Sequence, residues 1–201
     1  MKINKTDVNN VDLKNFIDIV QRTDHKKNIN APAGHHHYKL LAYLSLNLSG
    51  LIIELGTHHG TGTLALSANE KNKIISYDVK DIFGLSHQPE NLELRVENIL
   101  HNENNMKELL QAKLIFMDTA HTGDFETAIY NYLKENNYNG ILLLDDIHWS
   151  GEMIKFWNSI NITKYDITDI GHGDPRDTKG PSGNVPGTGL VDFTNKVTLV
   201  N

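Results

Sequence analysis

The sequence predicts an α/β protein with a doubly wound, mostly parallel sheet of seven strands, an antiparallel edge strand and helices on both faces. Short apolar runs such as 51–55 (LIIEL) and 140–147 (GILLLDDI) alternate with segments whose apolar residues have helical spacing. Continuous apolar strands are typical of a parallel sheet that is covered on both faces. Right-handed crossovers between such strands produce the doubly wound arrangement.

The size and charge of the chain limit the kind of protein it can be. Its 201 residues suffice for one domain and are few for two. A formal charge of −6 argues against a nucleic-acid partner, because phosphate binding needs clustered Lys and Arg. The absence of cysteine excludes disulfides and thiolate metal sites, and no apolar run is long enough for a signal peptide or a membrane span. We therefore expect a cytoplasmic protein that binds neither nucleic acid nor membrane.

The N-terminal part, residues 1–49, is expected to form a helical cap on a core of residues 50–201. Apolar residues at helical spacing predict an amphipathic helix over 8–21 and a second helix over 38–48. Cap and core together would make one domain.

The core is expected to alternate strands and helices. The predicted strands are 51–55, 73–79, 92–97, 113–118, 140–147, 165–170 and 190–200. The predicted helices are 61–68, 104–111, 124–137 and 151–160. No helix separates the last two strands, so they are expected to form an antiparallel pair at the sheet edge.

A long connection, residues 171–189, contains six of the 15 glycines and three of the five prolines. Loops of this length inside a compact domain are usually functional or irregular. The segment could be a lid over a ligand or a plain surface connection, and the sequence does not decide between the two.

A carboxylate and two glycines follow the first core strand in the pattern E-x-G-x-x-x-G, formed by Glu54, Gly56 and Gly60. Ligands of open α/β sheets bind beyond the carboxyl ends of the strands, and glycine lets the backbone approach them closely. The acid would repel a phosphate, and the dinucleotide motif GxGxxG and the Walker motif are both missing. The pattern favours a cationic nucleoside, S-adenosylmethionine, over NAD.

Two polar residues at the next strand ends fit the same ligand. Asp78 lies 18 residues after Gly60, where an acid typically binds the ribose hydroxyls, although a solvated strand-end residue or a helix cap would look the same. Asn98 could bind the edge of the adenine through its amide, or could be a simple turn residue.

Three carboxylates follow two further strands, Asp118 after the first and Asp145 with Asp146 after the second. Neighbouring strands lie about 4.8 Å apart, so these acids would meet and repel one another unless a cation lies between them. An all-oxygen set suits Mg²⁺, Ca²⁺ or Mn²⁺ better than zinc. We expect a divalent metal, Mg²⁺ or another, at this place.

The histidines near these acids could have several roles. His121 could be a general base, a metal ligand or part of the cofactor site, while Asp124 suits the capping of the next helix. The run 35–37 (HHH) could bind a metal, but we expect a polar lead into helix 38–48, because neighbouring residues of a helix point apart.

Four segments together resemble class I S-adenosylmethionine-dependent methyltransferases. They are ELGTHHGTGTLALS (54–67), Asp78, MDTAH (117–121) and LLLDDI (142–147). The resemblance is strongest to the metal-dependent O-methyltransferases: catechol O-methyltransferase and relatives that act on macrolide sugars or in cephalosporin pathways. It covers residues 35–193 and implies a Rossmann-like core.

The resemblance also implies roles for individual residues. Glu54, Gly56 and Gly60 would line the methionine end of the cofactor, with the backbone of Thr57, His58 and Thr61 around it. Asp78 would hold the ribose. Asp118, Asp145 and Asp146 would hold the metal, with Asp118 also touching the cofactor. His121 and Asp118 would be the catalytic residues.

These observations predict a methyltransferase that transfers a methyl group from S-adenosylmethionine to a hydroxyl of a small molecule with the help of a divalent metal. The alternatives are a non-catalytic binder of S-adenosylmethionine or S-adenosylhomocysteine and an NAD-dependent oxidoreductase. A chain of this size is also expected to associate into a homo-oligomer.

Overall fold

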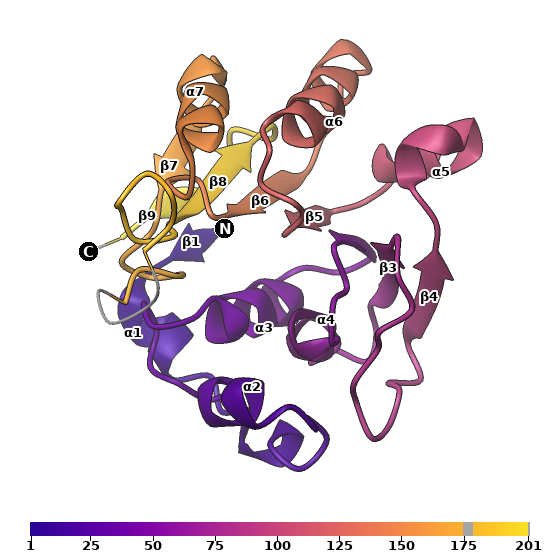
Figure 1. Ribbon diagram of the computed structural model, residues 1–201, viewed down its shortest axis with the longest axis vertical. Coiled ribbons are helices and arrows are strands. Elements are labelled where there is room, and N and C mark those ends of the chain that lie inside the picture. Colours follow the sequence, from indigo (N-terminus) through magenta and orange to yellow (C-terminus); the bar gives the residue numbers. More distant parts are fainter. Residues whose placement is uncertain (175–178, 201) are drawn as a thin grey trace.

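The computed structural model describes residues 1–174 and 179–200, and it contains a mixed sheet of seven strands (Figure 1). The strands of this sheet are β2 (Leu51–Leu55), β3 (Lys73–Asp78), β4 (Leu92–Val96), β5 (Leu114–Met117), β6 (Ile141–Asp145), β7 (Lys164–Asp166) and β8 (Thr188–Asp192). The helices are α1 (Lys5–Asn9), α2 (Thr23–Asn28), α3 (Tyr38–Asn47), α4 (Thr61–Leu66), α5 (Glu103–Leu109), α6 (Asp124–Glu135) and α7 (Gly151–Ser159), with 3₁₀ turns η1 (Lys14–Phe16) and η2 (Ile99–His101).

The order of the strands is β4-β3-β2-β5-β6-β8-β7, which confirms the predicted doubly wound, mostly parallel sheet. The first five strands are parallel, so their carboxyl ends share one edge of the sheet. β8 runs antiparallel to both β6 and β7. The predicted antiparallel pair at the edge is therefore confirmed, with β8 one place in from the edge.

Helices cover both faces of the sheet, as the apolar strands require. α5, α6 and α7 lie on one face, and α3 and α4 lie on the other with the N-terminal segment (Figure 1). Alternate strand residues point to opposite faces. Leu143 belongs to the core beneath α3 and α4, whereas Leu142 and Leu144 belong to the core beneath α6 and α7. Within the described residues, no helix has the length and apolarity needed to cross a membrane.

The predicted helix over residues 8–21 is wrong. Over this range the chain contains the end of α1 and the turn η1, and α2 begins only after it. The side chain of Asp12 accepts a hydrogen bond from the backbone N–H of Lys14 at 3.0 Å, and that of Asn30 accepts one from Leu13 at 2.9 Å. Such side-chain bonds compete with helical ones, so the apolar residues are buried without a continuous helix.

The predicted last strand, residues 190–200, is two strands instead of one. Asp192 accepts hydrogen bonds from the backbone of Thr194 (2.9 Å) and Val197 (2.8 Å), which closes a turn after β8. The chain then forms β9 (Thr198–Leu199), which pairs in parallel with β1 (Lys2–Ile3). The two ends of the chain thus lie side by side.

Candidate functional site

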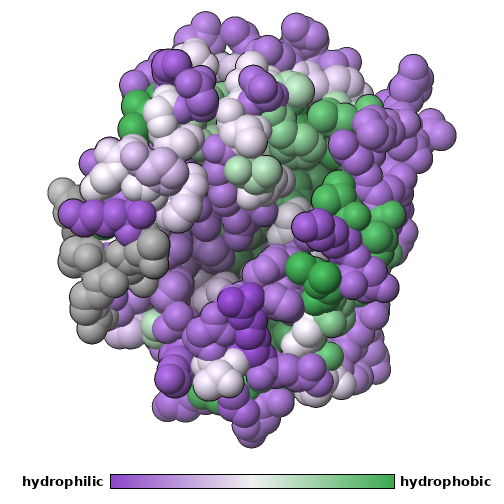
Figure 2. Space-filling view, in the orientation of Figure 1, coloured by the Kyte–Doolittle hydropathy of each residue, from purple (hydrophilic) through white to green (hydrophobic). Residues whose placement is uncertain are grey.

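A cavity of about 460 Å³ lies at the carboxyl ends of β2, β3, β4 and β5. Its lining residues are Leu55, Gly56, His58, Tyr77, Asp78, Val79, Glu97, Asn98, Ile99, Asp118, Thr119, Ala120 and Phe125. This volume is within the range of sites for small ligands. Figure 2 shows the same face of the molecule hollowed near its centre, with hydrophilic residues gathered in the hollow. Five of the residues predicted to bind the cofactor therefore share one cavity.

The two glycines of the first turn are required by packing as well as by conformation. Gly56 has a φ of 101°, and a Cβ there would lie 1.7 Å from the carbonyl oxygen of Asp118. Gly60 has a φ of 82°, and a Cβ there would lie 2.4 Å from the ring of Phe83. The space where each Cβ would lie is thus filled by protein atoms.

Asp78 lies on the wall of the cavity and also fixes the shape of the first turn. Its carboxylate accepts hydrogen bonds from the backbone N–H of His58 at 2.7 Å and of Lys80 at 2.9 Å. His58 has a φ of 47°, a left-handed conformation that the bond to Asp78 holds in place. The carboxylate thus couples the ends of β2 and β3 at the place predicted for the ribose.

Glu54 is buried within β2 and faces hydroxyl groups. It accepts hydrogen bonds from Thr63 and Ser76, and burial raises its pKa to about 8. It borders a second, smaller cavity of about 30 Å³. The other residues of that cavity are His25, His37, Tyr38, Gly56, Thr57, His58, His59, Thr61, Gly62 and Asp118.

The two threonines predicted in the methionine half of the site border this smaller cavity as well. The Thr57 hydroxyl lies 2.6 Å from that of Ser76, and the Thr61 hydroxyl lies 2.8 Å from Nδ1 of His25. Burial lowers the pKa of His25 to about 4, so its imidazole is neutral at pH 7. Two hydroxyls and one neutral imidazole therefore line part of the smaller cavity.

Asn98 lies on the wall of the larger cavity at the start of η2. Its side-chain oxygen accepts a hydrogen bond from the backbone N–H of Leu100 at 3.0 Å, so the side chain caps this short turn. This contact fits the simple turn residue given as the alternative, and the amide nitrogen of Asn98 could still contact a ligand.

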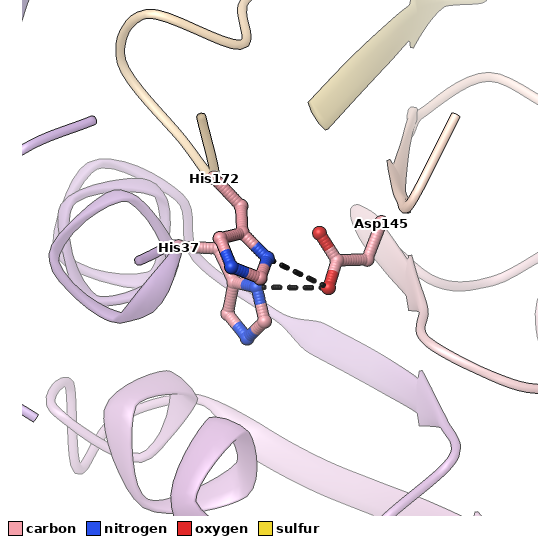
Figure 3. A group of neighbouring side chains, drawn as sticks. All are labelled: His37, Asp145 and His172. Atoms are coloured by element: carbon pink, nitrogen blue, oxygen red, sulfur yellow. Dashed lines mark ion pairs between the residues drawn. The ribbon is translucent and has the colours of Figure 1, made fainter. Parts of the chain in front are cut away.

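Asp145, the last residue of β6, is buried against two imidazoles (Figure 3). Its Oδ2 lies 3.1 Å from Nδ1 of His37 and 3.6 Å from Nδ1 of His172. Burial alone would raise the pKa of Asp145, but the two imidazoles outweigh it and hold the pKa well below its usual value. The carboxylate is therefore charged at neutral pH.

Asp118 and Asp146 lie on either side of His121. Nε2 of the imidazole is 3.4 Å from Asp118, and Nδ1 is 3.4 Å from Asp146. Burial would lower the pKa of His121, but these two carboxylates together with Asp145 raise it to about 9. Burial and the nearby Asp145 raise the pKa of Asp146 to about 7. His121 thus carries a proton at neutral pH.

The structure divides the three predicted metal ligands between two groups, Asp145 in one and Asp118 with Asp146 in the other. Among the described residues, the metal-compatible group whose donor atoms all lie within 4.8 Å of one another is His37, Asp145 and His172. From the sequence we considered metal binding for the run 35–37 but preferred a polar lead into the helix, and we did not single out His172. The signal for His172 was its position, directly after the predicted strand 165–170 and hence beside the sheet.

Comparisons with known proteins bear on the fold. No family model matches the sequence, and no curated protein matches it significantly. Among solved structures, the chain is similar to an O-methyltransferase from Bacillus cereus in complex with SAH, with 14% identity, a TM-score of 0.55, and coverage of 91% of this chain and 93% of that one. It is also similar to cofactor-bound Rv0187 from MTB, with 13% identity, a TM-score of 0.54, and coverage of 78% and 79%. The chain therefore shares the Rossmann-like fold of these structures.

Proposed function

We propose that the protein is an S-adenosylmethionine-dependent methyltransferase that methylates a hydroxyl group of a small molecule with the help of a divalent metal. The observation that carries the proposal is the cavity at the carboxyl ends of β2 to β5, which gathers Gly56, Asp78, Asn98 and Asp118 next to a group of acids and imidazoles. The similarity in fold to an O-methyltransferase in complex with SAH supports it.

The larger cavity would hold the nucleoside half of the cofactor. Asp78 would accept hydrogen bonds from the ribose hydroxyls, because its carboxylate has capacity beyond the two backbone bonds it already accepts. Asn98 would offer its amide N–H groups to the adenine. The methionine half would extend toward the smaller cavity, which Glu54, Thr61 and Asp118 border.

The acids beyond this cavity fit a divalent cation. Asp145 and Asp146 each have a buried carboxylate oxygen that finds no hydrogen-bond partner among the described residues, whereas buried polar atoms normally have one. A bound metal would lower the pKa of an acceptor hydroxyl and so favour its attack on the methyl group. Asp118, Asp145 and Asp146 are the proposed ligands.

His121 is the proposed base, and its surroundings set a condition on that role. With a pKa of about 9, His121 already holds a proton at neutral pH and cannot accept another from a substrate. A cation beside Asp118 or Asp146 would offset the carboxylate charge that keeps the proton bound. The imidazole could then take a proton from the acceptor, so metal and base would act together.

Calorimetry with S-adenosylmethionine, S-adenosylhomocysteine and NAD tests the cofactor assignment. We expect the first two to bind and NAD not to bind. Asp78→Asn should weaken binding about 10- to 100-fold through loss of a charged acceptor, whereas Asp81→Asn, an exposed acid in the next loop, should not. Binding of NAD alone would overturn the proposal.

Methyl transfer itself is tested with a panel of small hydroxyl compounds, using radiolabelled S-adenosylmethionine with added Mg²⁺ or with chelator. Turnover that chelator abolishes is expected. Tight cofactor binding without transfer to any acceptor would point to a non-catalytic binder.

A further inference from the structure

A compact group of two imidazoles and one carboxylate joins three distant segments of the chain. His37 directly precedes α3, Asp145 ends β6, and His172 follows β7 (Figure 3). His37 and Asp145 are buried, with 5% and 3% of their surfaces exposed, and His172 is half-buried. The three side chains point toward one another, with Oδ2 of Asp145 at the centre of the contacts.

The spacing of the donor atoms matches that of ligands around one metal ion. Two ligands bound at about 2.1 Å in tetrahedral or octahedral geometry lie about 3.0–3.4 Å apart. The Nδ1 atoms of His37 and His172 lie 3.1 and 3.6 Å from Oδ2 of Asp145, and all three donor atoms lie within 4.8 Å of one another. Little movement is needed to place one ion between them.

A buried ion pair without a metal explains the arrangement of these polar atoms less well. Oδ1 of Asp145 is buried and has no hydrogen-bond partner within the described part of the chain. Nδ1 of His37 lies 3.1 Å from Oδ2 but likewise has no hydrogen-bond partner among residues 1–174 and 179–200. A buried ion pair stabilises a protein only when its remaining polar atoms are satisfied. An ion that binds the imidazole nitrogen and the carboxylate would satisfy them.

We propose that His37, Asp145 and His172 form a binding site for a first-row divalent transition metal such as Zn²⁺, Fe²⁺ or Co²⁺. Imidazole nitrogens suit these ions, whereas Mg²⁺ and Ca²⁺ prefer oxygen ligands. Three protein ligands leave coordination positions for water or a substrate oxygen, as in catalytic metal sites. This set shares only Asp145 with the three acids discussed above.

The place of the site connects it with methyl transfer. His37 also borders the smaller cavity, together with Glu54 and Asp118. The metal would therefore adjoin the proposed methionine end of the cofactor, where an acceptor hydroxyl must lie. This assignment of the metal to the acceptor rests on the proposed function, whereas the binding of the metal does not.

Metal binding by the chelator-treated protein, without cofactor or acceptor, is the test. We expect one Co²⁺ per chain, bound at least about 100-fold more tightly than Mg²⁺, with a visible spectrum and X-ray absorption fine structure that show imidazole nitrogen. His172→Gln should weaken Co²⁺ binding about 100-fold. The matched control, His148→Gln, alters an imidazole that pairs with Asp166 outside the group and should leave binding unchanged.

The outcomes separate this inference from the proposed function. If the X-ray absorption fine structure of bound Co²⁺ shows oxygen ligands only, the inference is overturned by the natural protein alone. Co²⁺ binding that survives His172→Gln but is lost in Asp118→Asn would overturn it in favour of the three acids. Failure of S-adenosylmethionine to bind would instead overturn the proposed function and leave the metal site standing.

Discussion

Glu54 is a buried acid at the centre of the sheet, and its protonation couples pH to stability. Thr63 and Ser76 donate hydrogen bonds to it, while burial raises its pKa from an ordinary 4.5 to about 8. In the unfolded chain the group loses its proton near its ordinary pKa, whereas in the folded chain it keeps the proton to about pH 8. The stability present below pH 4.5 is therefore lost as the pH rises toward 8.

Glu54→Gln removes this dependence. The free energy of unfolding of the natural protein should fall, relative to that of the variant, by up to about 1.4 kcal/mol per pH unit between pH 5 and 8. Urea unfolding of both proteins at several pH values in this range measures the difference. Parallel curves would show that Glu54 ionises normally in the folded protein.

His121 makes the stability of the protein fall as the pH rises, whereas a buried neutral histidine makes it rise. The acids around it raise its pKa from 6.5 to about 9, so its stabilising contribution is complete below pH 6.5 and disappears as the pH rises through 9. We expect His121→Asn to lower the free energy of unfolding by about 1–3 kcal/mol at pH 6 and much less above pH 9. Asn tolerates the φ of 54° found here, which keeps backbone strain small.

Chelator is present throughout the His121→Asn measurement, so that only the protein's own charges act. A loss of stability that is the same at pH 6 and pH 9.5 would contradict the assigned pKa and point to lost packing instead.

The sequence located the strand-end acids correctly but not their directions. Asp145 and Asp146 are adjacent, and adjacent residues at a strand end point to opposite sides. One faces His37 and the other faces His121, so the two acids lie in different surroundings, which strand spacing alone did not indicate. The part played by His172 depends on how a long connection folds back onto the sheet, which local sequence patterns do not specify.

At the scale of single elements, the turn between β2 and α4 depends most strictly on residue type. Gly56→Ala would place a Cβ 1.7 Å from a backbone oxygen at a φ of 101°. We expect a loss of about 3–5 kcal/mol in the free energy of unfolding, or failure to fold. Thermal and urea unfolding measure it.

Gly151→Ala is the matched control for Gly56→Ala. Gly151 begins α7 and has open space around the position of a Cβ, and alanine favours a helix. The variant should be as stable as the natural protein or slightly more stable. Equal losses in the two variants would contradict the steric explanation.

Elements with strong periodicity were predicted within a few residues, as α3 and α6 show. The N-terminal segment was predicted wrongly, because the side chains of Asp12 and Asn30 accept backbone hydrogen bonds that replace helical ones. The periodicity of the sequence does not reveal such bonds. The predicted loop 171–189 gives way to β8 at its end, and its residues 175–178 lie outside the described residues.

At the scale of the whole molecule, the pairing of β1 with β9 joins the two ends of the chain. Ile3 is fully buried in the core beneath α3, whereas Val200, just after β9, is 40% exposed. Ile3→Ala should lower the free energy of unfolding by about 2–4 kcal/mol through lost burial and a cavity, and Val200→Ala should change it little. Urea unfolding measures both changes. Equally small losses for the two variants would show that the N-terminal strand is not packed firmly in the core.

The fold class was predictable because most core strands are apolar runs and most crossovers between parallel strands carry a helix, which leaves few topologies. The position of β8 between β6 and β7 was not predictable, since no local pattern indicates which neighbour a late strand chooses. A single domain with a helical cap, a cytoplasmic location and association into a homo-oligomer stay predictions.

The peptide bond between Asp145 and Asp146 links two separate imidazole environments. An ion that draws Asp145 toward His37 must also shift the backbone that carries Asp146, and hence the field felt by His121. The aromatic proton resonances of His121 are therefore a built-in reporter: in a nuclear magnetic resonance titration with diamagnetic Zn²⁺, they should move even though the ring binds nothing itself.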